Sequence, residues 1–295
     1  MRTLTTEAGI LLVDKPAGLS SAQVVGRLKK KHGCKRIGHA GTLDPMATGL
    51  LVCMVGAATR LASYAEAGSK IYAGTIDFGY VTDTDDIWGE VLNRSENLPI
   101  FSEVCEGAKK YCGQLWQVPP RISAVKVRGQ RAYQAARVGK PLKLEPRQVY
   151  VHKFDLLPVS RQRVFFRVHC SKGTYIRSLA RDLGADLGCG ACLSSLRREA
   201  SAPFSVSKAK PLEQLGVADL QHWSRLFPET PRLDLDAWEI DRLRDGDQRL
   251  LGALSLTGSD FAGAARLVYA DRVSGRACGL LVKRQDSWRL AVNLS

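Results

Sequence analysis

The sequence predicts a mixed α/β fold in which strands and helices pack in layers. Its 295 residues, 45% of them hydrophobic, are enough for one large or two ordinary domains with cores of their own. Short apolar runs typical of strands alternate with segments in which apolar residues recur at helical spacing. This alternation is irregular, so the regular strand–helix–strand repeat of a nucleotide-binding sheet is not expected.

The elements of the first half follow from apolar runs, caps and turn residues. The four apolar residues 10–13 predict a strand, and residues 14–18 predict a turn. Ser20 or Ser21 is a suitable N-cap for a helix that ends near residue 31. The next expected elements are a buried strand over residues 50–55, a helix over 57–66, a strand over 71–78 and a helix over 101–111.

Two strands and a helix are expected before residue 200. Residues 149–157 and 164–170 predict strands, and a helix follows from about residue 175 to residue 187. Residues 119–149 precede these strands and follow the helix expected over 101–111. They contain eight basic residues and one acidic residue, and their apolar content is weak. This composition predicts an exposed arm rather than a part of the core.

A second, smaller domain is expected at the end of the chain. Pro228 and Pro231 mark a linker, which divides the chain into domains of residues 1–231 and 232–295. After the linker come three short strand-like runs, at residues 264–269, 278–283 and 288–292, separated by turns that contain Gly and Asp. Residues 232–295 are therefore expected to form a small β-rich domain.

The net charge of +14 indicates a polyanionic partner, because basic side chains that neutralise phosphates release condensed counterions. The cations are also clustered. Six of them lie between residues 27 and 36, just before the most unusual loop of the chain: Arg27, Lys29, Lys30, Lys31, Lys35 and Arg36. The sequence thus favours a nucleic acid over a small or uncharged partner.

Several other classes are disfavoured. No apolar run approaches the roughly 20 residues that span a bilayer, and residues 1–7 lack a signal-peptide core, so a cytoplasmic protein is expected. Cys189 and Cys192 form a lone C-x-x-C pair without a second pair at zinc spacing, so neither a metal nor another cofactor is expected. The common phosphate-loop, dinucleotide, hydrolase and metalloprotease motifs do not occur.

The most informative segment surrounds Asp44. Pro45 restricts the conformation of Asp44, and nearby glycines allow a tight backbone path, so that one carboxylate is presented at a fixed angle. Such a carboxylate is suited to act as a nucleophile or a base. From spacing alone, an aspartate that merely closes a turn is the commoner explanation.

The complete string GHAGTLDPMATGLL, residues 38–51, resembles the signature of the TruB family of tRNA pseudouridine synthases. Further segments match that family in the same order: residues 12–18, 70–74, 82–86 with Gly89, and 170–184. The resemblance extends over about residues 8–200. It implies a pseudouridine synthase fold with an inserted basic thumb at about residues 119–149, and residues 232–295 then resemble an RNA-binding PUA-like domain.

The resemblance implies that the chain isomerises uridine 55 in the T-loop of tRNA to pseudouridine. Asp44 is then the catalytic carboxylate, which attacks C1′ of the sugar, adds at C6 of the base or abstracts a sugar proton. Arg177 pairs with it, since an arginine holds a carboxylate by bidentate hydrogen bonds. Tyr72 stacks on the flipped uracil and assists removal of the proton from C5.

The remaining site residues also follow from the resemblance. His39 fills the space that the flipped base leaves, Asp86 anchors the site from behind, and Leu196 forms the apolar wall of the uracil pocket. Lys15 braces the catalytic loop. Residues expected at the RNA are Tyr175 and, in the thumb, Lys126, Arg128 and Arg131.

Two alternatives remain open at this point. A guide-RNA-dependent synthase of the dyskerin kind shares the Asp44 and Arg177 motifs, but the family resemblance places the basic thumb only in the stand-alone enzymes. A chaperone that folds the tRNA T-arm without catalysis is the second alternative, and the presence of Asp44, Tyr72 and Arg177 argues against it. The expected partner is therefore the T-stem-loop of tRNA, without a guide RNA, an obligate protein partner or a membrane.

Overall fold

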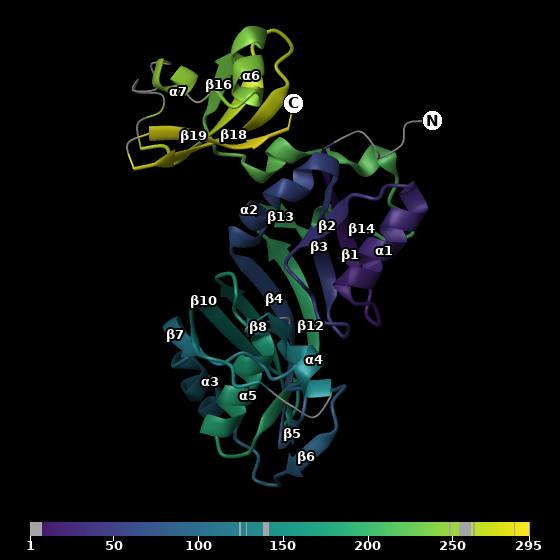
Figure 1. The fold of residues 1–295 in the computed structure, drawn as a ribbon. Coiled ribbons are helices and arrows are strands. Elements are labelled where there is room, and N and C mark those ends of the chain that lie inside the picture. The colour runs from purple at the N-terminus through teal and green to yellow at the C-terminus, as the bar shows by residue number, and fades with distance from the viewer. Residues whose placement is uncertain are drawn as a thin grey trace.

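The structure, a computed structural model, describes residues 8–294 apart from residues 124, 128, 138–141, 248, 254–260, 262 and 286. It confirms the mixed α/β class (Figure 1). A large mixed sheet forms the main body, and a separate four-stranded sheet near the C-terminus forms a small β-rich domain.

The large sheet is built in the order β14-β1-β3-β12-β4-β11-β10-β7, with β2, β13 and β15 attached at its sides. Most neighbouring strands are antiparallel, whereas β1 with β14 and β3 with β12 are parallel. The strands are β1 (Gly9–Lys15), β2 (Ile37–Ala40), β3 (Thr48–Val55), β4 (Lys70–Phe78), β7 (Gly113–Gln117), β10 (Arg147–Pro158), β11 (Arg163–Cys170), β12 (Ala191–Ser201), β13 (Phe204–Ser205), β14 (Lys210–Pro211) and β15 (Gln221–His222).

The remaining strands form smaller sheets. Strands β16 to β19 make the C-terminal sheet, and two hairpins project from the main body. Their bounds are β5 (Tyr80–Thr82), β6 (Val91–Arg94), β8 (Lys126–Val127), β9 (Gln130–Arg131), β16 (Arg232–Leu235), β17 (Arg266–Asp271), β18 (Ala277–Arg284) and β19 (Ser287–Asn293).

The helices flank these sheets. The α-helices are α1 (Ser21–His32), α2 (Ala62–Ala67), α3 (Phe101–Lys109), α4 (Ala132–Arg137), α5 (Ile176–Asp186), α6 (Ala237–Arg244) and α7 (Arg249–Ala253), and the 3-10 helices are η1 (Gly56–Leu61), η2 (Val206–Lys208), η3 (Val217–Asp219) and η4 (Trp223–Leu226). Ser20 caps α1 by accepting a hydrogen bond from the backbone of Gln23, and Gly33 ends the helix in a left-handed conformation.

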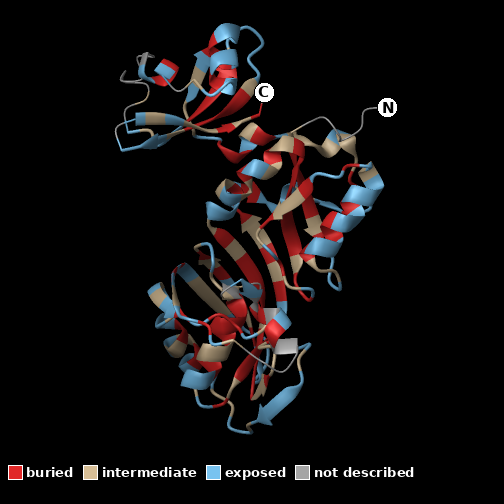
Figure 2. Ribbon diagram, viewed as in Figure 1, coloured by how far each residue is buried: buried red, intermediate tan, exposed pale blue. Residues whose placement is uncertain are grey.

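Two apolar clusters explain how the parts hold together. The first packs α3 and α5 against β4, β10, β11 and β12. The second joins Ile10 and Leu12 of β1 to Phe227, which follows η4, and to Val268 and Leu280 of the C-terminal sheet. Figure 2 shows that buried residues run along the central strands and continue into the C-terminal sheet. The C-terminal domain is therefore packed onto the main body rather than loosely tethered.

The structure also differs from the sequence analysis. Strand β12 was not predicted, although it lies in the middle of the large sheet, and neither were β7 and the two hairpins. Residues 119–149 do not form a wholly exposed arm, because Ala132, Ala135 and Leu144 are buried. Two of these are small apolar side chains on the short helix α4, and Leu144 lies beyond that helix. Charge counting alone did not indicate this burial. The assignment of residues 232–295 as PUA-like stays a prediction.

Gly74 tests the packing at the centre of the sheet. A Cβ atom at this position would overlap the backbone oxygen of Ser195 on β12, where neither strand can move freely. We expect Gly74→Ala to lower the free energy of unfolding by about 2–3 kcal/mol, as overpacking does in close-packed cores. Denaturant unfolding measures the change.

The matched control is Gly26→Ala on α1, where an added Cβ meets nothing within 4 Å. This substitution is expected to raise stability by about 0.5–1 kcal/mol, because alanine favours the helix over glycine. A Gly74→Ala protein as stable as the Gly26→Ala protein would contradict the tight β4–β12 pairing.

Candidate active site

Asp44 lies in a tight turn between β2 and β3. The turn is closed by a hydrogen bond of 3.0 Å from the Ala47 backbone N–H to the Asp44 carbonyl oxygen. Gly49 adopts a φ of +97°, and a Cβ there would overlap the backbone oxygen of Arg198 on β12. Only glycine fits this close approach, which fixes where the loop leaves the sheet.

The carboxylate of Asp44 is held by Arg177, at the start of α5. The Nε and Nη2 atoms of Arg177 donate to the two carboxylate oxygens, each over 2.9 Å. Arg177 is 4% exposed, whereas the Asp44 side chain is 32% exposed. The pair therefore has the bidentate geometry that makes such bonds strong, with the carboxylate at the open side.

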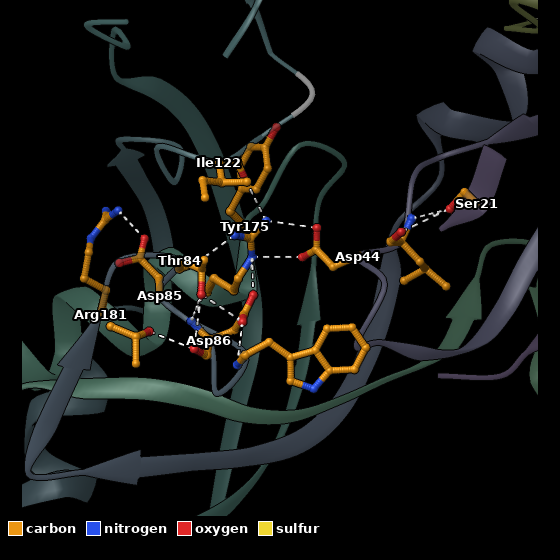
Figure 3. A network of polar contacts seen from close by, with 12 residues as sticks. Ser21, Asp44, Thr84, Asp85, Asp86, Ile122, Tyr175 and Arg181 are labelled. Carbon is orange, nitrogen blue, oxygen red and sulfur yellow. Dashed lines mark hydrogen bonds and ion pairs between the residues drawn. The ribbon is translucent and has the colours of Figure 1, made fainter. Parts of the chain in front are cut away.

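The guanidinium of Arg177 also bonds two other loops. Its Nη1 donates to the carbonyl oxygen of Thr84 over 2.8 Å, and its Nη2 donates to that of Ile122 over 2.9 Å. Figure 3 shows Asp44, Thr84, Asp86 and Ile122 close to one another, with dashed lines for the hydrogen bonds and ion pairs between the residues drawn. Segments separated by up to 133 residues are thus joined at a single cation.

Asp86 stands behind the pair. One carboxylate oxygen lies 3.8 Å from Nε of Arg177, and the other accepts hydrogen bonds from the Thr84 hydroxyl and the Trp88 backbone. Burial raises the pKa of Asp86, and the charge of Arg177 opposes that rise. Arg177 therefore faces two carboxylates, of which Asp44 is bound more closely.

Lys15 supports the Asp44 turn from β1. Its buried ammonium donates to the carbonyl oxygens of Pro16, Leu19 and, over 3.3 Å, Pro45. Burial lowers its pKa to about 8. A second anchor is Ser21, whose hydroxyl accepts a hydrogen bond from the Leu43 backbone over 2.8 Å. The turn is fixed on both sides of Asp44.

A cleft of about 490 Å³ opens beside Asp44. Tyr72 on β4 and Leu196 on β12 are side chains of its lining, and so is Tyr175 at the N-terminus of α5. Burial raises the pKa of both tyrosines. Five residues named from the sequence therefore surround one space: Asp44, Tyr72, Tyr175, Arg177 and Leu196.

Further charged residues of this cleft were missed by the sequence analysis. They are Glu66, Lys70, Arg147, Lys172 and Arg198. Lys70 donates to the carbonyl oxygens of Glu66 and Gly68, each over 2.6 Å, and burial lowers its pKa to about 8. Arg198 is recognisable only from its place on β12, a strand that the sequence does not predict. Lys70 stands two residues before Tyr72 in a recognised segment and was overlooked.

The other predicted residues are placed as follows. His39 lies on β2, where it pairs with Cys53, and it is not part of the cleft lining. Burial lowers its pKa, and its Nδ1 has no hydrogen-bond partner among the described residues. Lys126 and Arg131 belong to the β8–β9 hairpin. Arg128 lies outside the described residues.

Among the described residues, no three His, Cys, Asp or Glu side chains are placed to share a metal ion. Cys189 and Cys192 are both buried, and burial raises the pKa of each thiol. Within the same part of the chain, no helix has the length and apolar character to cross a membrane.

The arrangement suits chemistry at an electrophilic carbon. A partly exposed carboxylate, oriented by a buried guanidinium, faces a space with an aromatic ring and an apolar wall. Such a carboxylate is able to capture or stabilise a cationic carbon, and the ring and wall accommodate a flat heterocycle.

Comparisons with known proteins point to one family. Residues 29–176 match the family model of the TruB family pseudouridylate synthase N-terminal domain, and residues 177–232 match that of the tRNA pseudouridylate synthase B C-terminal domain. The chain is 50% identical to tRNA pseudouridine synthase B of Thermobifida fusca, with 95% of this chain and 96% of that protein covered. The enzyme of the same name from Anaplasma marginale is 41% identical, with 93% of each chain covered.

Solved structures show the same fold. A chain of a Cbf5-Nop10-Gar1 complex matches with a TM-score of 0.70 and 22% identity, covering 100% of this chain and 86% of that one. A chain of an H/ACA RNP bound to a substrate RNA matches with a TM-score of 0.67 and 20% identity, covering 97% and 84%. At this identity the likeness concerns the fold.

The low pKa of Lys70 predicts a pH dependence of stability. Between about pH 8 and 10.5 the unfolded chain keeps a proton on Lys70 that the folded chain has lost, so stability gains with rising pH. Across this window we expect the free energy of unfolding of wild type to rise relative to that of Lys70→Met, by at most about 1.4 kcal/mol per pH unit. Denaturant unfolding from pH 7 to 10.5 measures the difference.

The control is Lys30→Met at an exposed site of α1. Its stability relative to wild type is expected to stay flat over the same pH range. A flat difference for Lys70→Met as well would mean that the buried ammonium does not lose its proton early.

Proposed function

Since this chain belongs to the TruB family of tRNA pseudouridine synthases, we propose that it converts uridine 55 in the T-loop of tRNA to pseudouridine. The observation that carries the proposal is the bidentate Asp44–Arg177 pair at the mouth of a cleft lined by Tyr72 and Leu196. The reaction breaks the N1–C1′ bond and forms a C5–C1′ bond. C5 loses a proton and N1 gains one, so the product is an isomer.

In this proposal the carboxylate of Asp44 acts at the sugar or base electrophile that bond cleavage requires. Arg177 keeps both oxygens of Asp44 in a defined orientation, and Asp86 holds Arg177 from the other side. Because Arg177 is nearly fully buried, the pair does not need to reorganise when the substrate arrives. Orientation before binding is the main contribution of this network.

The base is recognised outside its stack. A uridine inside a folded T-loop has to be extruded before its C1′ atom meets Asp44, at a cost of a few kcal/mol. The ring of Tyr72 and the side chain of Leu196 then enclose the uracil. His39 is proposed to fill the space left in the loop, and its neutral form is favoured because burial lowers its pKa.

Affinity for tRNA comes from basic residues around the cleft. Arg147 and Lys172 line its rim, and the hairpin that carries Lys126 and Arg131 belongs to the segment proposed as a thumb. Phosphate contacts of this kind give affinity with little dependence on base sequence. We propose that this segment, including Arg128, closes over the T-stem-loop.

The guide-RNA-dependent alternative is less well supported. The solved structures of similar fold include protein and RNP assemblies, but they share only 20–22% identity with this chain. The curated relatives at 41–50% identity are named tRNA pseudouridine synthase B. We therefore propose an enzyme that acts on tRNA without a guide RNA and without an obligate protein partner.

Replacing Asp44 with Asn removes the charge and keeps the shape. We expect pseudouridine formation to fall by on the order of 10⁴-fold or more, as for the loss of a covalent catalyst. The affinity for tRNA should stay within a few-fold, because phosphate contacts dominate it. Single-turnover assays and filter binding measure the two quantities, and a variant that retains more than about 1% of the rate would exclude Asp44 as this catalyst.

An isolated T-arm hairpin tests the substrate. We expect unmodified hairpin RNA in excess over the enzyme to be fully converted at the position of uridine 55, because RNA-binding proteins of this kind recognise a loop and its stem by shape. Carbodiimide-dependent stops of reverse transcription map the product. Binding without product would indicate a chaperone, and product only after an added RNA or protein would indicate a guide- or partner-dependent enzyme.

A further inference from the structure

Arg198 is a buried cation that makes none of the ion pairs among the described residues. Its side chain belongs to β12, is 1% exposed and lines the cleft beside Asp44 and Tyr72. Its charge adds to those of Lys15 and Lys70, which are also buried near it. Burying an unpaired charge is costly, so its presence calls for a compensating role.

The guanidinium of Arg198 bridges two parts of the main chain. Its Nε donates to the carbonyl oxygen of Leu50 on β3 over 2.7 Å, and its Nη2 donates to that of Gly41 over 3.0 Å. Gly41 lies three residues before Asp44 and has a φ of +84°. Its N–H donates to the carboxylate of Glu66 on α2 over 3.0 Å. Arg198 thus ties the entry of the Asp44 loop to the sheet.

The same side chain acts on Tyr72. Arg198 and Tyr72 are directly paired residues of β12 and β4, so their side chains project from the same face. Burial raises the pKa of Tyr72, and the charge and hydrogen bonding of Arg198 oppose that rise. Other ionisable groups face this space from every neighbouring element. They are Asp44 from the loop, Glu66 from α2, Lys70 from β4, Arg147 from β10, Cys170 from β11, Lys172 from the turn after β11, and Tyr175 and Arg177 from the start of α5.

We propose that Arg198 is a positioning residue for this reaction, which holds the Asp44 loop on strand β3 and keeps a positive charge against the hydroxyl group of Tyr72. The proposal rests on the proposed function in one respect, the use of Tyr72 as proton acceptor. After C5 has bonded to C1′, the ionised phenol takes the C5 proton. The C–H electron pair then forms the C5–C6 double bond, the electron pair of the N1–C6 double bond moves onto N1, and N1 takes a proton from water.

Arg198→Met tests the charge, because methionine fills part of the space without a cation. Tyr72 is replaced in the full-length chain by 3,5-difluorotyrosine, whose phenol ionises near neutral pH, and phenolate absorbance is followed against pH. Removing the neighbouring cation should move the midpoint to higher pH by about one unit, since a nearby opposite charge favours the ionised form. This measurement needs no reaction, so it tests Arg198 even if the proposed function fails.

Activity provides the second measurement, with native Tyr72. We expect Arg198→Met to lower the single-turnover rate by about 10- to 100-fold while tRNA affinity changes less than about threefold. Arg198→Lys keeps a charge but cannot bridge both carbonyl oxygens with a planar fork. Arg198→Lys should keep the phenol titration midpoint of wild type and still have a lower single-turnover rate. If Arg198→Met does not fold, the lysine variant provides the test.

The matched control is Arg197→Met on the same strand. Arg197 projects to the other side of the sheet, where its guanidinium pairs with both oxygens of Asp14 over 3.0 and 2.7 Å. This control should leave the phenol midpoint unchanged. An unchanged midpoint and rate in folded Arg198→Met would overturn the proposal, as would a loss confined to tRNA affinity, which would make Arg198 an RNA contact instead.

Discussion

The site depends on one buried guanidinium. Arg177 receives a carboxylate from the β2–β3 turn, a carbonyl oxygen from the loop after β5 and a carbonyl oxygen from Ile122. Within the part of the chain that the structure describes, no backbone–backbone hydrogen bond joins these three segments to one another. Arg177 therefore supplies a direct link between them. Removing one partner of a buried charged pair typically costs about 3–5 kcal/mol, because the other charge is left unpaired. Orientation of Asp44 and local stability are therefore coupled.

The other buried cations follow a different rule. Lys15, Lys70 and Arg198 are bonded to backbone carbonyl oxygens and make no ion pair within the described residues. Carbonyl oxygens satisfy the donors and leave the positive charge uncompensated. The low pKa values of the two lysines express the cost of this arrangement. In return, the region around Asp44 and Tyr72 is favourable for the negative charge that develops when a base leaves a sugar.

Much of the architecture was predictable from local patterns. Ser20 and Gly33 delimit α1 as capping chemistry requires, and the apolar run of β3 is buried along nearly its whole length. Strand β12 was not predictable in this way, because its sequence ACLSSLRREAS has neither a continuous apolar run nor a regular alternation. Two bulges shift its register against β4, so the side-chain pattern changes phase within the strand.

The missed strand explains why Arg198 was missed. Asp44, Arg177 and Tyr72 stand in motifs that are informative without any structure, whereas Arg198 has meaning only through its pairing with Tyr72 and its contact with Gly41. In sequence, Arg197 and Arg198 are equivalent neighbours. In the structure one forms a half-exposed ion pair and the other is buried at the cleft. Register, which assigns alternate residues to opposite faces, separates the two roles.

The proposed function assigns charge at the surface and charge in the interior to different steps. Exposed cations such as those of α1 act on a polyanion over a distance of about 10 Å at 0.1 M salt and are screened as salt rises. The cations around Asp44 are enclosed by protein, where screening is weak. In the proposed function, a chain with net charge +14 divides its cations between two tasks. The outer cations collect and orient RNA, and the inner cations set the electrostatics around the reacting base.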